Sequence, residues 1–208
     1  MKVLLVNGSA REKGCTHTAL TEVAKALNDT EISTEIFFLG TDAVRDCIGC
    51  QSCRKTGKCV FDDDMVNGFV EKAKTADGFV FGSPVYYAHP SGRLLCFMNR
   101  VFYSAGGIFA HKPAAAVVSA RRAGTTAAID VINKYFQIAG MPVVSSNYWN
   151  MVHGNTPDDV RRDAEGLQIM HLLGQNMAWM LKSFDKARKN GVLPPETPEK
   201  IKTNFIRD

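Results

Sequence analysis

The chain has 208 residues, of which 45% are hydrophobic, and a formal net charge of +4 at pH 7. This length suits one α/β domain, and the apolar share is enough for a substantial core, which argues against a disordered chain. A short basic cluster at 182–189 is more typical of a solvated helix face than of a nucleic-acid site. The apolar start at 1–6 is too short for a secretory signal, and no apolar run reaches the length of a membrane helix. We therefore expect a cytoplasmic protein without nucleic-acid or membrane partners.

Short apolar runs alternate with longer amphipathic stretches along the chain. The runs are rich in Val, Phe or Ala, and several end in Gly or Ser, as buried parallel strands do. We predict strands at 3–6, 35–39, 78–81, 114–118 and 143–146. We predict helices at 18–27, 65–75, 94–103, 125–138 and 160–189. Five strands separated by helices predict an α/β fold with a doubly wound parallel sheet and helices on both faces.

The loop after the first predicted strand carries hydroxyl and guanidinium donors. Ser9, Arg11, Thr16 and Thr18 lie between this strand and the first turns of the next helix. Free N–H groups and the helix dipole favour a phosphate at such a place. Neither G-x-G-x-x-G nor a P-loop is present, so a dinucleotide fold is disfavoured. The loop therefore predicts a phosphate site, with an ordinary capped turn as the alternative.

The pattern Gly-Ser-x-Arg at 8–11, followed by Thr16, resembles the phosphate loop of the NADPH-dependent FMN reductase family. The resemblance implies a flavodoxin-like fold, FMN as cofactor, NAD(P)H as electron donor, and assembly into a homodimer or homotetramer. The family often has Pro and Asn where this chain has Ala10 and Cys15. We count Cys15 among the cofactor-binding residues, although a cysteine there can also fill a small site without a redox role.

Four cysteines in the loop 47–59, after the second predicted strand, form the pattern C-x2-C-x2-C-x5-C. They are Cys47, Cys50, Cys53 and Cys59. Thiolates at this spacing can converge on one [4Fe–4S] cluster. A metal-free patch of reduced thiols is the main alternative. Zinc is a weaker one, because four-cysteine zinc sites usually use two separated C-x2-C pairs. The spacing and the acidic stretch that follows resemble the iron–sulfur flavoproteins of anaerobes, a branch of the same family. Cys96, inside a predicted helix, is expected to be a core thiol.

The loop after the third predicted strand contains Pro84, Val85, Tyr86 and Tyr87. Its pattern Ser-Pro-Val-Tyr at 83–86 resembles the family's flavin-ring loop. Either tyrosine can lie against a flat ring, because its side chain combines apolar area with a polar tip. Packing in the core or at a subunit interface is the alternative for both.

The loop after the fourth predicted strand contains Ser119, Arg121, Arg122, Gly124 and Thr125. It resembles the family loop that meets the polar edge of the flavin, although family members often have glycine at 119–120. An arginine at that edge would stabilise reduced flavin, and solvated surface arginines are the alternative. Because the carboxyl ends of parallel strands meet at one edge of a sheet, the three loops predict one FMN site.

The C-terminal region changes character after the last predicted helix. Residues 1–190 are expected to form the FMN-binding domain. Gly191 and the prolines at 194, 195 and 198 cannot continue a helix. We therefore predict that 191–208 is an extended tail, which either crosses a partner subunit or lies loose.

Together these motifs imply an FMN-dependent oxidoreductase of the iron–sulfur flavoprotein type. It would pass electrons from NAD(P)H or reduced ferredoxin through FMN to a small-molecule or protein acceptor. Hydride chemistry belongs to the flavin, so no catalytic side chain is assigned. One alternative is a cluster-free NAD(P)H-dependent reductase of flavins, quinones, nitro or azo compounds. Another is a redox-responsive binding protein that senses oxidants through its thiols, for which steady turnover is not expected.

Overall fold

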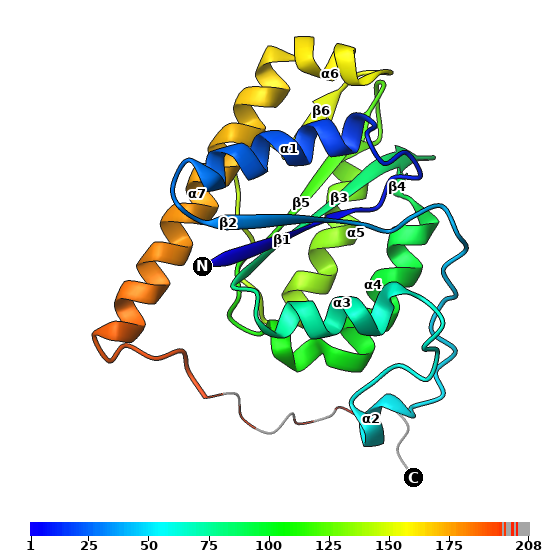
Figure 1. The fold of residues 1–208 in the computed structure, drawn as a ribbon, viewed down its shortest axis with the longest axis vertical. Helices are drawn as coiled ribbons and strands as arrows, with labels where there is room; N and C mark the ends of the chain where they lie inside the picture. The colour runs from blue at the N-terminus through cyan, green and yellow to red at the C-terminus, as the bar shows by residue number, and fades with distance from the viewer. Residues whose placement is uncertain (197, 199–200, 202, 204–208) are drawn as a thin grey trace.

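The computed structural model describes residues 1–196, 198, 201 and 203, and Figure 1 shows its elements. The strands are β1 (Lys2–Asn7), β2 (Ser33–Phe38), β3 (Gly78–Tyr86), β4 (His89–Pro90), β5 (Ala114–Ala120) and β6 (Met151–His153). The helices are α1 (Cys15–Asn28), α2 (Cys53–Thr56), α3 (Met65–Lys74), α4 (Gly92–Ala105), the 3-10 helix η1 (Gly106–Phe109), α5 (Thr125–Ile138), α6 (Pro157–Arg162) and α7 (Ala164–Lys189).

Five of the strands form a parallel sheet in the order β2-β1-β3-β5-β6, and β4 pairs antiparallel with the end of β3. Without β4, this is the 2-1-3-4-5 order of doubly wound flavodoxin-like sheets. β1 lies between β2 and β3, with Leu5 paired to Ile36 on one side and to Val80 on the other. The predicted α/β fold is confirmed, and the short β4 is an addition to it.

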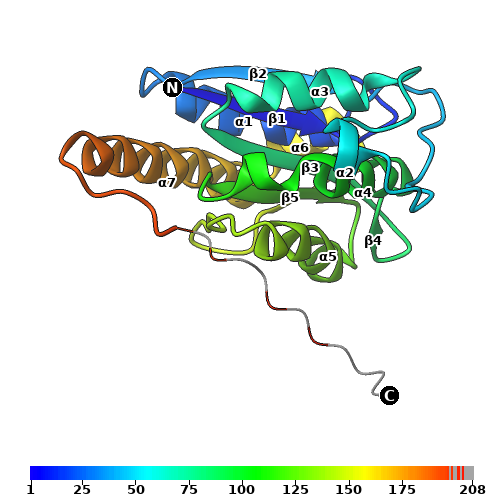
Figure 2. The same cartoon turned by 90° about the horizontal axis from the view of Figure 1, so that it is seen from below.

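Alternate residues of the central strands enter two separate cores. Leu4 and Val6 pack in the core that includes α3, α4 and α5, whereas Val3 and Leu5 pack in the core that includes α1 and α7. Because strand side chains alternate between faces, a sheet covered on both faces requires an uninterrupted apolar run. Figures 1 and 2 show helices on both faces of the sheet.

Two predicted elements are wrong in detail. Residues 143–146 are not a strand: only Val143 bridges to Ala114, and β6 takes the fifth position of the sheet. Pro142 lacks a backbone N–H group, so this segment has one hydrogen-bond donor fewer for pairing with a neighbouring strand. The helix predicted at 160–189 is broken at Asp163, whose carboxylate accepts hydrogen bonds from the N–H groups of Gly166 and His153. That carboxylate caps α7, so α6 and α7 are separate helices.

The remaining boundaries follow from local chemistry. Asp64 caps α3 by accepting from the N–H group of Val66 at 3.1 Å.

Residues 191–196 form no helix or strand, whereas 197, 199–200, 202 and 204–208 of the predicted tail lie outside the described residues. Across the part of the chain that the structure describes, the search for a helix both long and apolar enough to cross a bilayer found none.

Candidate functional site

A pocket at the carboxyl edge of the sheet brings together the loop after β1 and the last residues of β3 and β5. The sequence pattern predicted that the third strand ends at 81, whereas β3 continues to Tyr86, so Pro84, Val85 and Tyr86 lie on the strand itself. Nine of the predicted cofactor-binding residues line it: Ser9, Arg11, Cys15, Thr16, Pro84, Val85, Tyr86, Ser119 and Arg121. The sequence reasoning missed three further lining residues, Ala120, Gly154 and Asn155. The last two follow β6, a strand that the sequence pattern did not reveal.

The loop after β1 is shaped by Asn7, which is fully buried. Its Oδ1 accepts from the N–H group of Ser9 at 3.1 Å, and its Nδ2 donates to the carbonyl of Glu12 at 2.9 Å. Ser9 Oγ in turn accepts from the N–H group of Arg11 at 3.0 Å. These bonds curl the loop around the start of α1, so its hydroxyl and guanidinium donors reach the pocket together.

The start of α1 has no side-chain cap and no acidic residue in its first turn. The N–H groups and positive dipole end of this turn are therefore left for an anion. Thr16, in the same turn, shares a hydrogen bond of 2.8 Å with Ser119 at the end of β5. This buried pair fixes the spacing between the first loop and the loop after β5.

The ends of β1 and β3 are locked to the start of α4. Gly8 N–H donates to the carbonyl of Gly82 at 2.9 Å, and a Cβ on Gly8 would lie 2.9 Å from that oxygen. Ser91, the N-cap of α4, donates through Oγ to the carbonyl of Gly8 and through N–H to Ser83 Oγ, each at 2.8 Å. The strand ends beside the pocket are therefore joined to this helix by hydrogen bonds.

Five other predicted cofactor-binding residues do not line this pocket. Thr18 Oγ1 donates to the carbonyl of Gly14 within its own helix turn. Tyr87 is fully exposed at a φ of 51°, and the carbonyl of Arg122 lies 3.0 Å from His153 Nε2. Gly124 caps α5 at a φ of 92°, and Thr125 starts that helix.

Cys15 lies at the pocket wall with its Sγ 3.7 Å from the carbonyl of Gly154. Burial raises the pKa of this thiol, an effect that its own backbone N–H and Arg11 only partly offset. Burial thus disfavours the thiolate form of Cys15, which argues against a nucleophilic role.

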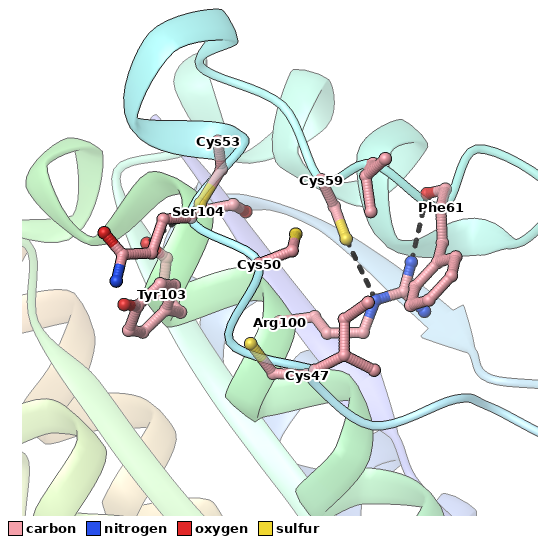
Figure 3. Close-up of a pocket in the computed structure, with 11 residues that line it drawn as sticks. Cys47, Cys50, Cys53, Cys59, Phe61, Arg100, Tyr103 and Ser104 are labelled. Carbon is pink, nitrogen blue, oxygen red and sulfur yellow. Dashed lines mark hydrogen bonds between the residues drawn. The ribbon is translucent and has the colours of Figure 1, made fainter.

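A second pocket gathers all four cysteines of the loop 47–59 (Figure 3). Cys47, Cys50, Cys53 and Cys59 line it together with Phe61, Arg100, Tyr103 and other residues, and all four are free thiols. Nevertheless, among the described residues, no three Cys, His, Asp or Glu side chains lie in an arrangement that would hold a metal ion. The thiols thus share one pocket without being drawn together at its centre.

Side chains of α4 hold both ends of the cysteine loop. At the first end, Asp46 Oδ1 accepts from the N–H group of Cys47 at 2.7 Å and from Asn99 Nδ2 at 2.8 Å. At the other end, Arg100 Nε donates to Cys59 Sγ at 3.2 Å. The sequence reasoning missed Arg100, although a charged residue on the apolar face of a predicted helix was a usable signal.

One helix connects the surroundings of the two pockets. α4 begins beside the strand ends of the first pocket and carries Arg100 and Tyr103 of the second. At 1.5 Å of rise per residue, Gly92 and Arg100 are about 12 Å apart along the axis. Arg93 also donates to the carbonyls of Gly40 and Thr41, which keeps the segment leaving β2 against α4. Figure 1 shows this segment descending beside α4 to α2.

Comparison with known proteins agrees with this arrangement. The sequence profile of the family described as NADPH-dependent FMN reductase matches residues 1–156. An iron–sulfur flavoprotein from Methanocaldococcus jannaschii is 34% identical over 200 residues, covering 89% of this chain and all of that protein. A structure of RosB with a bound intermediate superimposes with a TM-score of 0.72 at 13% identity, covering 99% of this chain and 92% of the other. A flavodoxin from the domain Archaea gives a TM-score of 0.60 at 16% identity, with 88% and 99% covered.

Proposed function

Because the chain belongs to the NADPH-dependent FMN reductase family, we propose that it is an FMN-dependent oxidoreductase that also binds a [4Fe–4S] cluster. The first pocket holds the FMN and the cysteine pocket holds the cluster. NAD(P)H or a reduced ferredoxin supplies the electrons, and a small molecule or protein accepts them. The 34% identical relative that is named an iron–sulfur flavoprotein supports this assignment over its whole length.

The donor set of the first pocket fits a flavin mononucleotide phosphate. The uncapped first turn of α1 offers backbone N–H groups, Ser9 and Thr16 offer hydroxyls, and Arg11 offers a charged fork. Arg121 lies on the opposite loop, where a positive charge stabilises the polar edge of a reduced ring. Bound FMN supplies the hydride and single-electron chemistry, so the protein residues need only bind, orient and shield it.

The donor set of the second pocket fits an iron–sulfur cluster in type and number. A cluster of this kind needs four thiolates, and one loop brings four cysteines to one pocket. Their spread does not count against the assignment, because metal sites are rarely preformed and the ligands usually close on the metal. Cys96, on α4, does not line this pocket.

The observation that carries the proposal is that one helix, α4, connects the strand ends beside the flavin pocket with the four thiols. Its N-cap joins the strand ends of the flavin pocket, and residues about two turns later border the four thiols. The helix that carries Arg100 is therefore hydrogen-bonded at its start to the strand ends beside the proposed flavin site.

A cluster-free NAD(P)H-dependent reductase is the second candidate. The family profile over residues 1–156, which is described as NADPH-dependent FMN reductase, is consistent with it. In this case the cysteine loop is a thiol patch, and FMN passes hydride equivalents directly to a quinone, nitro, azo or flavin acceptor.

The test is chemical analysis of protein purified without oxygen. Flavin released by acid is identified by chromatography, and iron and acid-labile sulfide are measured per flavin. About four of each per FMN supports the proposal, and FAD as the main product contradicts the flavin assignment. Cys53→Ser should lose the iron, whereas the control Cys96→Ser should keep it. Iron near zero with rapid NAD(P)H oxidation would favour the cluster-free reductase.

A further inference from the structure

Arg100 is a charged side chain in an apolar place. It lies on α4 between the buried residues Phe97 and Val101, and it is only 1% exposed. Guanidinium groups stay protonated in proteins, so burying one is costly unless its donors are paired. The partners of Arg100 therefore show what an arginine does at this position.

One set of partners neutralises and immobilises the fork of the guanidinium. Both terminal nitrogens of Arg100 donate to the carboxylate of Asp64, Nη2 at 3.1 Å. Nη2 also donates to the carbonyl of Phe61 at 3.1 Å. Asp64 is itself fixed, because it is the N-cap of α3. Because the two terminal nitrogens are held in this way, the Nε–H group is fixed as well. It donates to the sulfur of Cys59 at 3.2 Å. Figure 3 shows this contact at the pocket wall.

Cys59 is also the most firmly held of the four cysteines. Asn67 accepts from its N–H group at 2.9 Å and donates to its carbonyl at 3.0 Å. By contrast, Cys50 is exposed, and the sulfur of Cys53 has a long contact of 4.0 Å to the carbonyl of Tyr103. The cysteine loop thus has one rigid thiol, fixed through both its backbone and its sulfur.

We propose that Arg100 is a positioning residue that presents Cys59 as the anchoring ligand and raises the reduction potential of the bound cluster. The inference rests on the proposed cluster. On reduction the cluster accepts one electron, and no bond in the protein forms or breaks. A buried positive charge and an N–H group on a ligand sulfur both stabilise the more negative, reduced state. Asp64 offsets part of this effect, because it brings a negative charge to the same place.

This arrangement predicts opposite shifts from its two members. Arg100→Gln removes the charge and the Nε donor, so the reduction potential should fall. We expect the one-electron equilibrium constant to change about tenfold, which corresponds to 59 mV. Asp64→Asn keeps a side chain that can cap α3 but removes the opposing negative charge, so the reduction potential should rise. We expect the one-electron equilibrium constant to change by about threefold or more. Lys58→Gln is the matched control, since it removes an exposed charge next to Cys59 and should change little.

The potentials are measured by anaerobic redox titration with mediators, following the cluster by electron paramagnetic resonance, after iron has been counted in each protein. Opposite shifts with an unchanged Lys58→Gln control support the inference. Unchanged potentials, or shifts of the same sign in both variants, overturn it and leave the proposed function standing. Wild-type protein without iron overturns both. If Arg100→Gln fails to fold or to load iron, Asp64→Asn decides alone: a raised potential supports the inference, and an unchanged one overturns it.

Discussion

Arg11 offers a direct test of how the first pocket recognises its ligand. Its backbone N–H bonds Ser9 Oγ, whereas its side chain lines the pocket. Arg11→Ala therefore keeps the loop bond and removes only the charged fork. A lost charge-assisted hydrogen bond is worth about 1.5–3 kcal/mol. Because Arg11 is exposed to solvent, we expect the lower half of that range, a rise of roughly 10- to 50-fold in the FMN dissociation constant.

The assay is a titration of flavin-free protein with FMN, followed by flavin fluorescence and repeated with riboflavin, which lacks the phosphate. Lys13→Ala is the matched control, since it removes an equal charge from an exposed residue of the same loop. Arg11→Ala should weaken FMN binding and leave riboflavin binding nearly unchanged. Equal effects of Arg11→Ala and Lys13→Ala on FMN, or an equal loss for riboflavin, would refute a specific contact between Arg11 and the phosphate.

Three further predictions concern stability. Asn67→Ala should lower the free energy of unfolding by about 1–3 kcal/mol, because it leaves the partly buried backbone groups of Cys59 without their side-chain partner. A urea titration showing a change of less than about 0.5 kcal/mol, roughly the scatter of surface substitutions, would contradict this. Phe69→Ala should lower the free energy of unfolding by about 3–5 kcal/mol in the same assay, since this fully buried ring packs edge-on against Phe97 with the ring centroids 5.0 Å apart. A loss near 1 kcal/mol, which is typical of an average substitution, would show that neighbouring side chains fill the cavity. Hydrogen bonds from Lys2 and Lys72 lower the pKa of Glu35. Its contribution to the free energy of unfolding is therefore fully present above its unfolded-state pKa and is lost as the pH falls through its folded-state pKa. Wild type and Glu35→Gln should thus differ modestly near neutral pH and converge once the pH is below the folded pKa of Glu35, whereas a constant difference would exclude these ion pairs as the cause.

The sequence by itself determined the fold class, four of the five strands of the parallel sheet and the residue types that the loops at the sheet edge carry. Helix 125–138 was predicted with its observed bounds, because periodicity and caps are encoded within the helix itself. The four cysteines and the Gly-Ser-x-Arg loop at 8–11 were visible for the same reason, since their spacing is local. Their functional roles remain proposals, but their positions in the fold follow from the strand that each loop leaves.

Only the tertiary structure decided which distant residues meet. The fifth sheet position went to 151–153 rather than 143–146, because pairing with β5 depends on where the chain returns and not on apolar content alone. Local pattern also could not show that Arg100 reaches Cys59, 41 residues away, or that Thr16 pairs with Ser119 across 103 residues. Such contacts arise from the packing of α4 and α1 against the sheet, and a buried charge becomes interpretable only when its partners are in place.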